Sequence, residues 1–329
     1  MPDPDGLMRA AQVTELGRPP QVTSVPRPKP GGDEILLEVT AAALNPVTIT
    51  TASGTYYGGH PPLPYIPGSE GTGRVVADGP LAAGTRVRFE ASELRSGALA
   101  EFCVTAAANC VELPASLSDR LAAGLGVAGL AAWLALRDGA RLLPGETVVV
   151  LGATGAVGQI GIQAARIMGA GRIVAAGRDL DALQICLGLG ADAVVALDES
   201  LELDELAASL LEAAGGPLQV VLDPLFGRPS MAASRACGTG ARLVNLGQSA
   251  GAEATYRSRD IRGKRLSIIG HANGAVSPAV RRSAFVELAT HAAQGRIRVE
   301  VEEFPLHEVQ AAWLRQQQSP HRKVVVRPV

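Results

Sequence analysis

The stretch TVVVLGATGAVG, residues 147–158, decides the fold of this chain. Its β-branched apolar run predicts a buried parallel strand, and the glycine-rich turn predicts a dinucleotide pyrophosphate site at the start of a helix. Glycines let backbone N–H groups approach the phosphates, and the helix dipole favours their negative charge. The residues that we expect to contact the cofactor in this turn are Thr154, Gly155, Ala156 and Val157.

The residues after the turn supply the context that this motif requires. Apolar positions from Ile160 to Met168 follow a helical period, and glycines at 169 and 171 predict the end of that helix. Arg172–Ala176 then predicts a second strand, which completes a βαβ unit. The first glycine spacing is one residue wider than in the usual motif. The alternative interpretation is a buried strand and helix with glycines for tight packing only.

The end of the second strand indicates which nucleotide binds. NAD-binding proteins need a carboxylate there for the ribose 2′-OH, whereas this chain has Gly177 and Arg178. A guanidinium suits a 2′-phosphate, so we predict NADPH, with a solvated surface arginine as the alternative. Asp179 is predicted to cap a helix over Asp179–Leu187.

Composition limits the classes of protein. A length of 329 residues suggests two domains, and a net charge of −2 with 19% charged residues gives no case for nucleic acid or an anionic membrane. The uncharged run Leu121–Leu136 is too short to span a bilayer and is predicted as a tightly packed helix between domains. Scattered cysteines favour a reducing, cytoplasmic location; they are Cys103, Cys110, Cys186 and Cys237.

The predicted secondary structure changes near residue 120. Before it, short strand-like runs between Pro and Gly turns predict a mostly β domain; the runs are Ile35–Val39, Gly73–Val76, Arg86–Phe89 and Ala100–Val104. After it, strands alternate with helices, which predicts an α/β fold with a doubly wound parallel sheet. The expected elements are helices Glu202–Ala214, Ser230–Cys237, Pro278–Ala293 and Glu308–Gln317, and strands Leu218–Asp223, Arg242–Leu246, Leu266–Gly270 and Lys323–Arg327.

A series of short motifs runs in one order along almost the whole chain. They are ALNPV at 43–47, SGTY at 53–56, PYIPGSE at 64–70, GLAAW at 129–133, LVNLG at 243–247 and SIIG at 267–270. Together with the glycine turn, they resemble the zinc-independent medium-chain dehydrogenases/reductases, close to the NADPH:quinone oxidoreductases that include zeta-crystallin. The resemblance implies a GroES-like catalytic domain over 1–120, a Rossmann domain over 121–270, and a return to the first domain over 271–329. It also implies a homodimer joined through the Rossmann sheets.

The same resemblance predicts that no metal is bound. Zinc-dependent relatives carry a Gly-His-Glu triplet and a lobe with four cysteines, whereas this chain has Gly68-Ser69-Glu70 and lacks the lobe. His60 and Glu70 are two ligands without a thiolate, which do not build a tetrahedral site.

The resemblance places the loop from Asn45 to Tyr56 in a substrate cleft that faces the nicotinamide. Asn45 offers an amide donor, or stabilises the turn before Pro46; Tyr56 offers a phenolic donor, or packs under the loop. Many relatives carry an acidic residue, a tyrosine and a threonine at the three positions where this chain has Thr48, Thr50 and Ala131, in that order.

Further cofactor contacts carry over from the family by position. Gly177 and Arg178 face the adenosine phosphate. Leu246, Gly247 and Gln248 follow the strand that points to the nicotinamide ribose, and His271, Ala272 and Asn273 reach the carboxamide side. Phe226 walls the cleft or belongs to the core. For His271, the alternative is a histidine that is bonded to backbone at a subunit interface.

These observations predict an NADPH-dependent reductase that transfers hydride, without metal, to quinones or α,β-unsaturated carbonyl compounds. One alternative is an enoyl-thioester reductase of the same fold, which needs a basic patch for phosphates; Arg281-Arg282 and Arg257 with Arg259 are candidates. Another is an NADPH-binding protein with little turnover, which the residues at 48, 50 and 131 favour.

Overall fold

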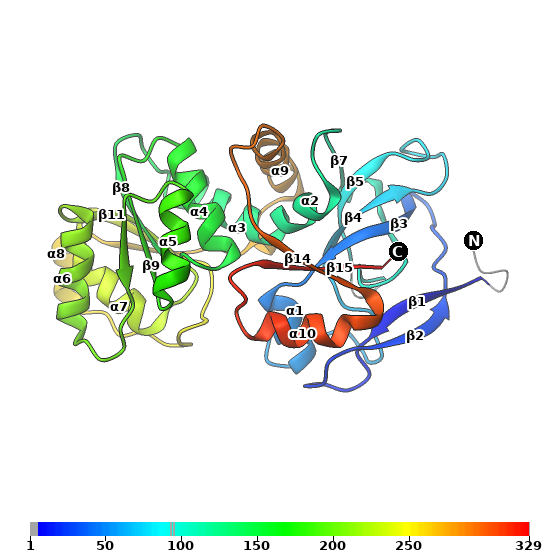
Figure 1. Cartoon of the computed structure of the whole chain (residues 1–329), viewed down its shortest axis with the longest axis horizontal. Coiled ribbons are helices and arrows are strands. Elements are labelled where there is room, and N and C mark those ends of the chain that lie inside the picture. Colours follow the sequence, from blue (N-terminus) through cyan, green and yellow to red (C-terminus); the bar gives the residue numbers. More distant parts are fainter. Residues whose placement is uncertain (1–5, 93, 95, 329) are drawn as a thin grey trace. The chain divides into compact units, whose positions relative to one another are not determined.

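The computed structural model describes residues 6–328, apart from 93 and 95. The chain divides into two compact units (Figure 1). The first comprises Met1–Val127 and Pro278–Val329, and the second comprises Ala128–Ser277. The chain therefore passes between units at 127/128 and 277/278, rather than at the expected 120/121 and 270/271.

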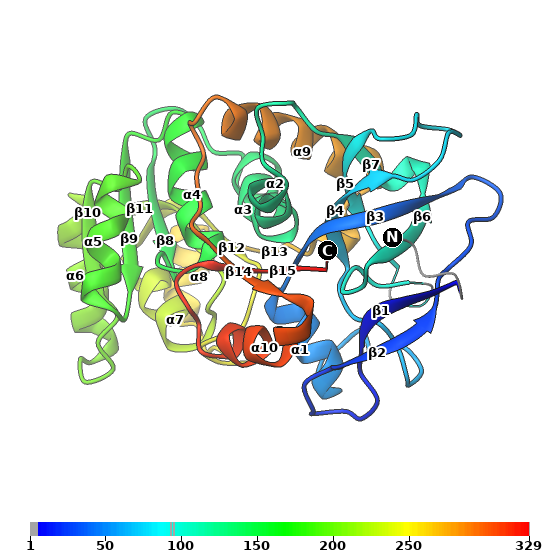
Figure 2. The ribbon, with the colours of Figure 1, turned by 45° about the vertical axis from the view of Figure 1, so that its right-hand side comes forward.

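The first unit is built on a seven-stranded sheet of order β14-β15-β3-β4-β5-β7, with β6 paired to β3 off this path. C-terminal strand β15 pairs antiparallel with β3, Val325 opposite Ala43, so the end of the chain completes the N-terminal sheet (Figure 2). β1 and β2 form a separate antiparallel pair. The bounds are β1 Leu7–Gln12, β2 Gln21–Pro26, β3 Glu34–Ala43, β4 Glu70–Val75, β5 Arg86–Glu90, β6 Phe102–Ala106, β7 Cys110–Glu112, β14 Val301–Pro305 and β15 Lys323–Arg327.

Helices of the first unit pack around this sheet. Alternate residues of β3 are buried, and Leu37, Phe89 and Trp313 belong to the main core of the unit. The helices are α1 Pro46–Ser53, α2 Asp119–Leu125, α9 Pro278–Ala293 and α10 Val309–Gln317, with short 3₁₀ turns at Ala107–Asn109 and Leu306–Glu308.

The second unit is a six-stranded parallel sheet of order β10-β9-β8-β11-β12-β13. α6 and α7 share one core cluster with the sheet, and α4 and α5 contact β8, β9 and β10. The predicted doubly wound sheet is therefore confirmed. The bounds are β8 Thr147–Leu151, β9 Arg172–Gly177, β10 Ala193–Ala196, β11 Leu218–Asp223, β12 Cys237–Asn245 and β13 Ser267–Gly270; α3 Val127–Leu134, α4 Ala156–Ile167, α5 Leu180–Gly188, α6 Leu203–Ala214, α7 Gly227–Ala236 and α8 Ser258–Lys264.

Local side-chain bonds fix several of these elements. Asp179 caps α5 as predicted, since its Oδ1 accepts the Ala182 N–H at 3.0 Å. Arg242 on β12 donates two hydrogen bonds to Glu146, at 2.8 and 2.5 Å, and a third to the Ala140 carbonyl. Paired guanidinium–carboxylate bonds of this kind hold β12 in place beside the segment that leads into β8.

The predicted single helix over Leu121–Leu136 is wrong. α2 ends at Leu125 and α3 begins at Val127, followed by a π-helical turn over Ala135–Gly139. The chain leaves the helical path at Gly126, whose ψ is −100°, and the Glu70 carboxylate accepts the Val127 N–H at 2.6 Å where α3 begins. Among the described residues no single helix is long and apolar enough to cross a membrane; only this bent pair passes that test together.

In the second unit, two elements begin well before their predicted first residues. β12 begins at Cys237 rather than Arg242, because Cys237 pairs with Leu218 before a register shift. α7 begins at Gly227 rather than Ser230, directly after Phe226, whose φ of 56° sets the turn into the helix.

Gly126→Ala tests the break between α2 and α3. The added methyl group would overlap the Glu70 carboxylate, so we expect the free energy of unfolding to fall by about 2–3 kcal/mol. Gly263→Ala in α8 is the matched control: nothing lies within 4 Å of its added methyl, and helix propensity predicts a gain of up to about 1 kcal/mol. Chemical denaturation measures both, and a Gly126→Ala protein as stable as the control would contradict the packing described.

Candidate functional site

The glycine turn between β8 and α4 has the geometry of an anion site. A Cβ at Gly158 would lie 2.5 Å from the Ala153 Cα, so only glycine fits, whereas a Cβ at Gly155 would meet only the Gly152 carbonyl, at 3.5 Å. α4 has no side-chain cap, and among the described residues nothing accepts the N–H groups of Ala156 and Val157. These open donors at a helix N-terminus suit a phosphate.

The parallel topology brings the other predicted cofactor residues to the same edge. Arg178 follows β9, Leu246–Gln248 follow β12, and His271–Asn273 follow β13. A Cβ at Gly177 would lie 3.2 Å from the Thr154 Cγ2, and one at Gly247 would lie 2.5 Å from the Pro224 carbonyl. The loops at the carboxyl ends of the strands therefore pack against one another through glycine, where doubly wound sheets bind ligands.

Arg178 presents a positive charge at this edge. Its side chain is exposed, and no described residue forms a hydrogen bond or ion pair with it. The carboxylate of neighbouring Asp179 is turned to the Ala182 N–H. The guanidinium is therefore available to an anionic ligand.

Asp223, at the end of β11, shapes the same edge and was missed by sequence reasoning. Its Oδ1 accepts the N–H groups of Leu225 and Phe226 at 3.0 and 2.8 Å, while its Oδ2 is buried without a partner among the described residues. Burial raises the pKa of Asp223, although hydrogen bonds to the carboxylate oppose the rise. Phe226 itself is half-buried, with its ring 6.3 Å from that of Tyr256.

The His271 ring lies against a side chain of its own loop. Its Nε2 lies 3.0 Å from the Asn273 Oδ1, and its backbone N–H donates to the Asn245 carbonyl at 2.8 Å. The Asn245 Nδ2 donates to the Gly247 carbonyl at 2.7 Å. These bonds fix the two loops after β12 and β13.

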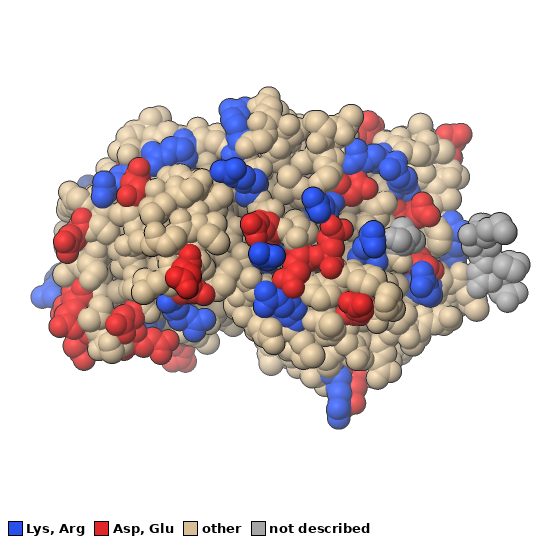
Figure 3. Space-filling view, viewed as in Figure 1, with Lys and Arg blue, Asp and Glu red and all other residues tan. Residues whose placement is uncertain are grey.

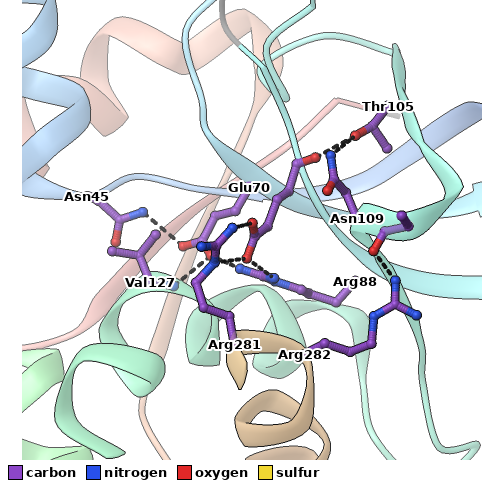
Figure 4. A network of polar contacts seen from close by, with 10 residues as sticks. Asn45, Glu70, Arg88, Thr105, Asn109, Val127, Arg281 and Arg282 are labelled. Carbon is purple, nitrogen blue, oxygen red and sulfur yellow. Dashed lines mark hydrogen bonds and ion pairs between the residues drawn. The ribbon is translucent and has the colours of Figure 1, made fainter. Parts of the chain in front are cut away.

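In the first unit, a buried carboxylate organises the predicted substrate loop (Figure 4). The Asn45 Nδ2 donates to the Glu70 Oε1 at 2.9 Å, and Arg88 donates to the Glu70 Oε2 at 3.1 Å. The three side chains are between 1% and 3% exposed. With the Val127 N–H, they satisfy a charge that would otherwise be very costly to bury.

The network continues from Arg88 into α9. Arg88 also pairs with Glu90 at 3.0 Å, and Arg281 binds both Glu90 oxygens, at 3.1 and 2.7 Å. Although burial opposes it, the hydrogen bond from Arg281 and the charge of Arg88 lower the pKa of Glu90. Arg282 donates to the Ala108 carbonyl. The pair Arg281-Arg282 is therefore engaged within the unit. Of the other candidates, Arg257 is paired with Asp204, whereas Arg259 is exposed and forms no hydrogen bond or ion pair with a described residue.

Lys323, on β15, holds Asn45 from its other side. Its Nζ donates to the Leu44 carbonyl at 2.9 Å and to the Asn45 Oδ1. Burial lowers the pKa of Lys323 to about 8, with Glu70 opposing the shift. Both ends of the Asn45 amide are thus bonded within the unit. No local signal links a lysine at 323 to an asparagine at 45, which is why sequence reasoning missed it.

Tyr56 follows α1 and the left-handed Gly54 that ends it. Its ring centroid lies 4.5 Å from that of Tyr57, which is 84% exposed. The hydrogen bond with Tyr57, followed by burial, raises the pKa of Tyr56 to about 12. A Cβ at Gly58 would lie 2.6 Å from the Tyr56 ring, so glycine makes room for it. Tyr56 is therefore a neutral hydrogen-bond donor at ordinary pH.

The threonines of this loop differ from each other. The buried Thr48 hydroxyl has no partner among the described residues, whereas the Thr50 hydroxyl donates to the Val47 carbonyl at 3.1 Å. Thr48 therefore has hydrogen-bonding capacity left over, and Thr50 contributes to the structure of α1.

The donor set does not fit zinc. Both Glu70 oxygens are taken by Asn45, Arg88 and Val127, and the His60 Nδ1 lies 2.8 Å from the Pro61 carbonyl. No group of three or more His, Cys, Asp or Glu side chains within the described part of the chain could hold a metal.

Comparison with known proteins identifies related families for both units. Residues 31–115 match the alcohol dehydrogenase GroES-like domain, and residues 156–290 match the zinc-binding dehydrogenase family. The Rattus norvegicus quinone oxidoreductase is 33% identical over 269 residues, which cover 80% of each chain.

A second similar protein is much longer. It is a phenolphthiocerol/phthiocerol polyketide synthase protein of Mycobacterium tuberculosis, 30% identical over 98% of this chain, but the match spans only 15% of that protein.

Solved structures share the fold. A mycobacterial quinone oxidoreductase is 25% identical, with a TM-score of 0.86 over 98% of this chain and 100% of that one. The quinone oxidoreductase of Thermus thermophilus, known also in complex with NADPH, is 29% identical, with a TM-score of 0.79 over 98% and 100% of the two chains.

Lys323→Met tests the buried ammonium group. Between pH 8 and 10.5, the unfolded wild-type chain keeps a lysine proton that the folded protein has released. Raising the pH through this window therefore stabilises the folded wild type, by up to about 3 kcal/mol relative to Lys323→Met. Denaturation of both proteins across the window measures the difference, and a difference that does not change with pH would contradict the assignment.

Proposed function

Because this chain belongs to the quinone oxidoreductase family of the medium-chain dehydrogenases/reductases, we propose that it is an NADPH-dependent reductase of quinones or α,β-unsaturated carbonyl compounds. The observation that carries the proposal is the open helix N-terminus at Ala156 and Val157, beside an unpaired arginine at 178. Fold alone would not suffice, since one fold supports many activities.

Arg178 supports NADPH over NADH. In the proposal, the N–H groups of Ala156 and Val157 bind the diphosphate, Gly177 leaves room for the adenosine ribose, and Arg178 binds the 2′-phosphate in bidentate fashion. Leu246, Gly247 and Gln248 bind the nicotinamide ribose, and His271, Ala272 and Asn273 lie on the carboxamide side. The bonds at Asp223 and Asn245 hold the supporting loops rigid, which favours binding of a large ligand.

The substrate loop supplies a donor and its support. NADPH, when bound, supplies the hydride. Tyr56 donates a hydrogen bond to the acceptor oxygen, where negative charge develops, because its raised pKa keeps the phenol protonated. Asn45 is 1% exposed and bonded to Lys323 and Glu70, so we assign it to holding the loop rather than to direct donation.

We propose that the reaction needs no metal. Hydride transfer to a conjugated carbon requires stabilisation of the resulting oxyanion, which a neutral phenol supplies. Glu70 supports this assignment, because its carboxylate is neutralised by Arg88 and is not open to a cation.

Reduction of enoyl thioesters is the second candidate. The observation that favours it is the likeness to a polyketide synthase protein over 98% of this chain. The third candidate, a binding protein with little turnover, rests on Thr48, Thr50 and Ala131.

We further propose a cytoplasmic homodimer. All four cysteines are buried and free, as suits a reducing compartment. β13 lies at the edge of its sheet with Ile268 39% exposed, so it offers a surface for a second copy. Sedimentation velocity measures the mass, and a monomer at micromolar concentration would contradict the dimer.

Acceptor panels test the reaction. We expect NADPH oxidation with small quinones and enones to exceed that with crotonyl-type thioesters, and Tyr56→Phe to lower kcat/KM by about 10- to 100-fold without weakening NADPH binding. Faster thioester reduction would favour the second candidate. Tight NADPH binding without turnover on either panel would leave only the third candidate, a binding protein with little turnover.

Arg178→Ala tests the choice of nucleotide. We expect NADPH to bind about 100-fold more weakly, because a charge-assisted bidentate contact is lost, and NADH affinity to stay within about twofold. Titration of both nucleotides measures this. Equal losses for the two would show that the arginine does not read the 2′-phosphate.

A further inference from the structure

The first unit contains a hollow of about 490 Å³ that none of the preceding assignments uses. Its lining includes Thr40 and Ala41, at an irregularity of β3. Its rim carries four arginines from four elements: Arg74 of β4, Arg86 of β5, Arg120 of α2 and Arg327 of β15.

Two of these arginines are neutralised and hold the structure. Arg86 binds Asp119 at 2.5 Å and donates to the Leu117 carbonyl at 2.6 Å, which fastens the start of α2 to β5. Arg120 pairs with Glu303 at 3.1 Å. Their carboxylate partners also line the hollow.

The other two arginines are not neutralised. Arg74 and Arg327 are exposed, and no described residue forms a hydrogen bond or ion pair with either. Glu38 lies opposite Arg74 in the β3–β4 register without pairing with it. The rim therefore carries four positive and two negative charges, although the whole chain has a net charge of −2. Figure 3 shows basic and acidic side chains interspersed on the face over α2 and β15.

Strand pairing brings these arginines together. Arg74 stands directly opposite Arg86 in the β4–β5 register, so an unpaired guanidinium lies next to one that is paired with Asp119. Sequence alone does not reveal the convergence, because Arg74 and Arg327 lie far apart in the chain. They are brought to one pocket by the pairing of β3 with both β4 and β15.

We propose that this hollow, the arginine pocket, binds the diphosphate group of a small molecule. Planar guanidinium groups match phosphate oxygens in bidentate geometry, and two unpaired arginines beside two paired ones suit two linked phosphates better than one. The volume lies within the range of ligand pockets, so an organic group attached to the diphosphate also fits. Inorganic pyrophosphate and coenzyme A share this chemistry.

Calorimetric titration of the full chain with sodium pyrophosphate tests the arginine pocket. NADPH is kept saturating, because the glycine turn of the second unit is itself proposed as a diphosphate site. We expect one equivalent of pyrophosphate to bind. Arg74→Gln and Arg327→Gln should each weaken binding about tenfold, and the double variant about 100-fold. If NADPH does not bind, the titration is run without it. The wild-type protein is then expected to bind two equivalents of pyrophosphate and the double variant one.

The control is Arg18→Gln, an exposed arginine of the same unit that pairs with Glu15 outside the pocket; it should leave the affinity unchanged. Coenzyme A in a second arm identifies the source of the ligand: tighter binding than pyrophosphate, lost in the same variants, indicates an organic diphosphate, and equal binding indicates the free ion. No saturable pyrophosphate signal up to about 10 mM, or equal affinity in the double variant, would overturn the proposal.

Discussion

The Glu70 carboxylate is the constraint on which the first unit depends. A charge that is 1% exposed must be paired and fully hydrogen-bonded, and the partners available to it come from distant parts of the chain. Arg88 neutralises it from β5, Asn45 donates from the start of α1, and the Val127 N–H donates where α3 begins. One carboxylate therefore fixes the start of the loop from Asn45 to Tyr56, the neighbouring strand and the end of α2 together.

The second unit depends instead on the close approach of backbone segments at glycine residues. Gly158 lets α4 lie against the β8 turn, Gly177 lets the end of β9 lie against Thr154, and Gly247 lets the loop after β12 lie against Pro224. The result is an edge at which the Ala156 and Val157 N–H groups and the Arg178 guanidinium form no hydrogen bond or ion pair with any described residue. Such an edge is preorganised for an anionic nucleotide before any ligand arrives.

The features that depend on local chemistry could be predicted from the sequence. The strand, glycine turn and helix at 147–167, the cap at Asp179 and the alternation of strands and helices all follow from spacing and side-chain type, and the structure confirms them. The single helix over 121–136 was wrong because no local signal shows that a glutamate at 70 captures the Val127 N–H. Lys323 and Arg88 escaped for the same reason, because strand pairing across the chain sets their partners. Strand pairing alone also brings Arg74 and Arg327 to one pocket. The roles of Asn45 and Tyr56 in catalysis remain predictions.

A crystal structure of this protein grown with NADPH tests the assignment of the cofactor site. We expect the diphosphate at the N–H groups of Ala156 and Val157, with the 2′-phosphate against the Arg178 guanidinium. A nucleotide bound away from the carboxyl edge of the six-stranded sheet, or with its 2′-phosphate far from Arg178, would contradict it.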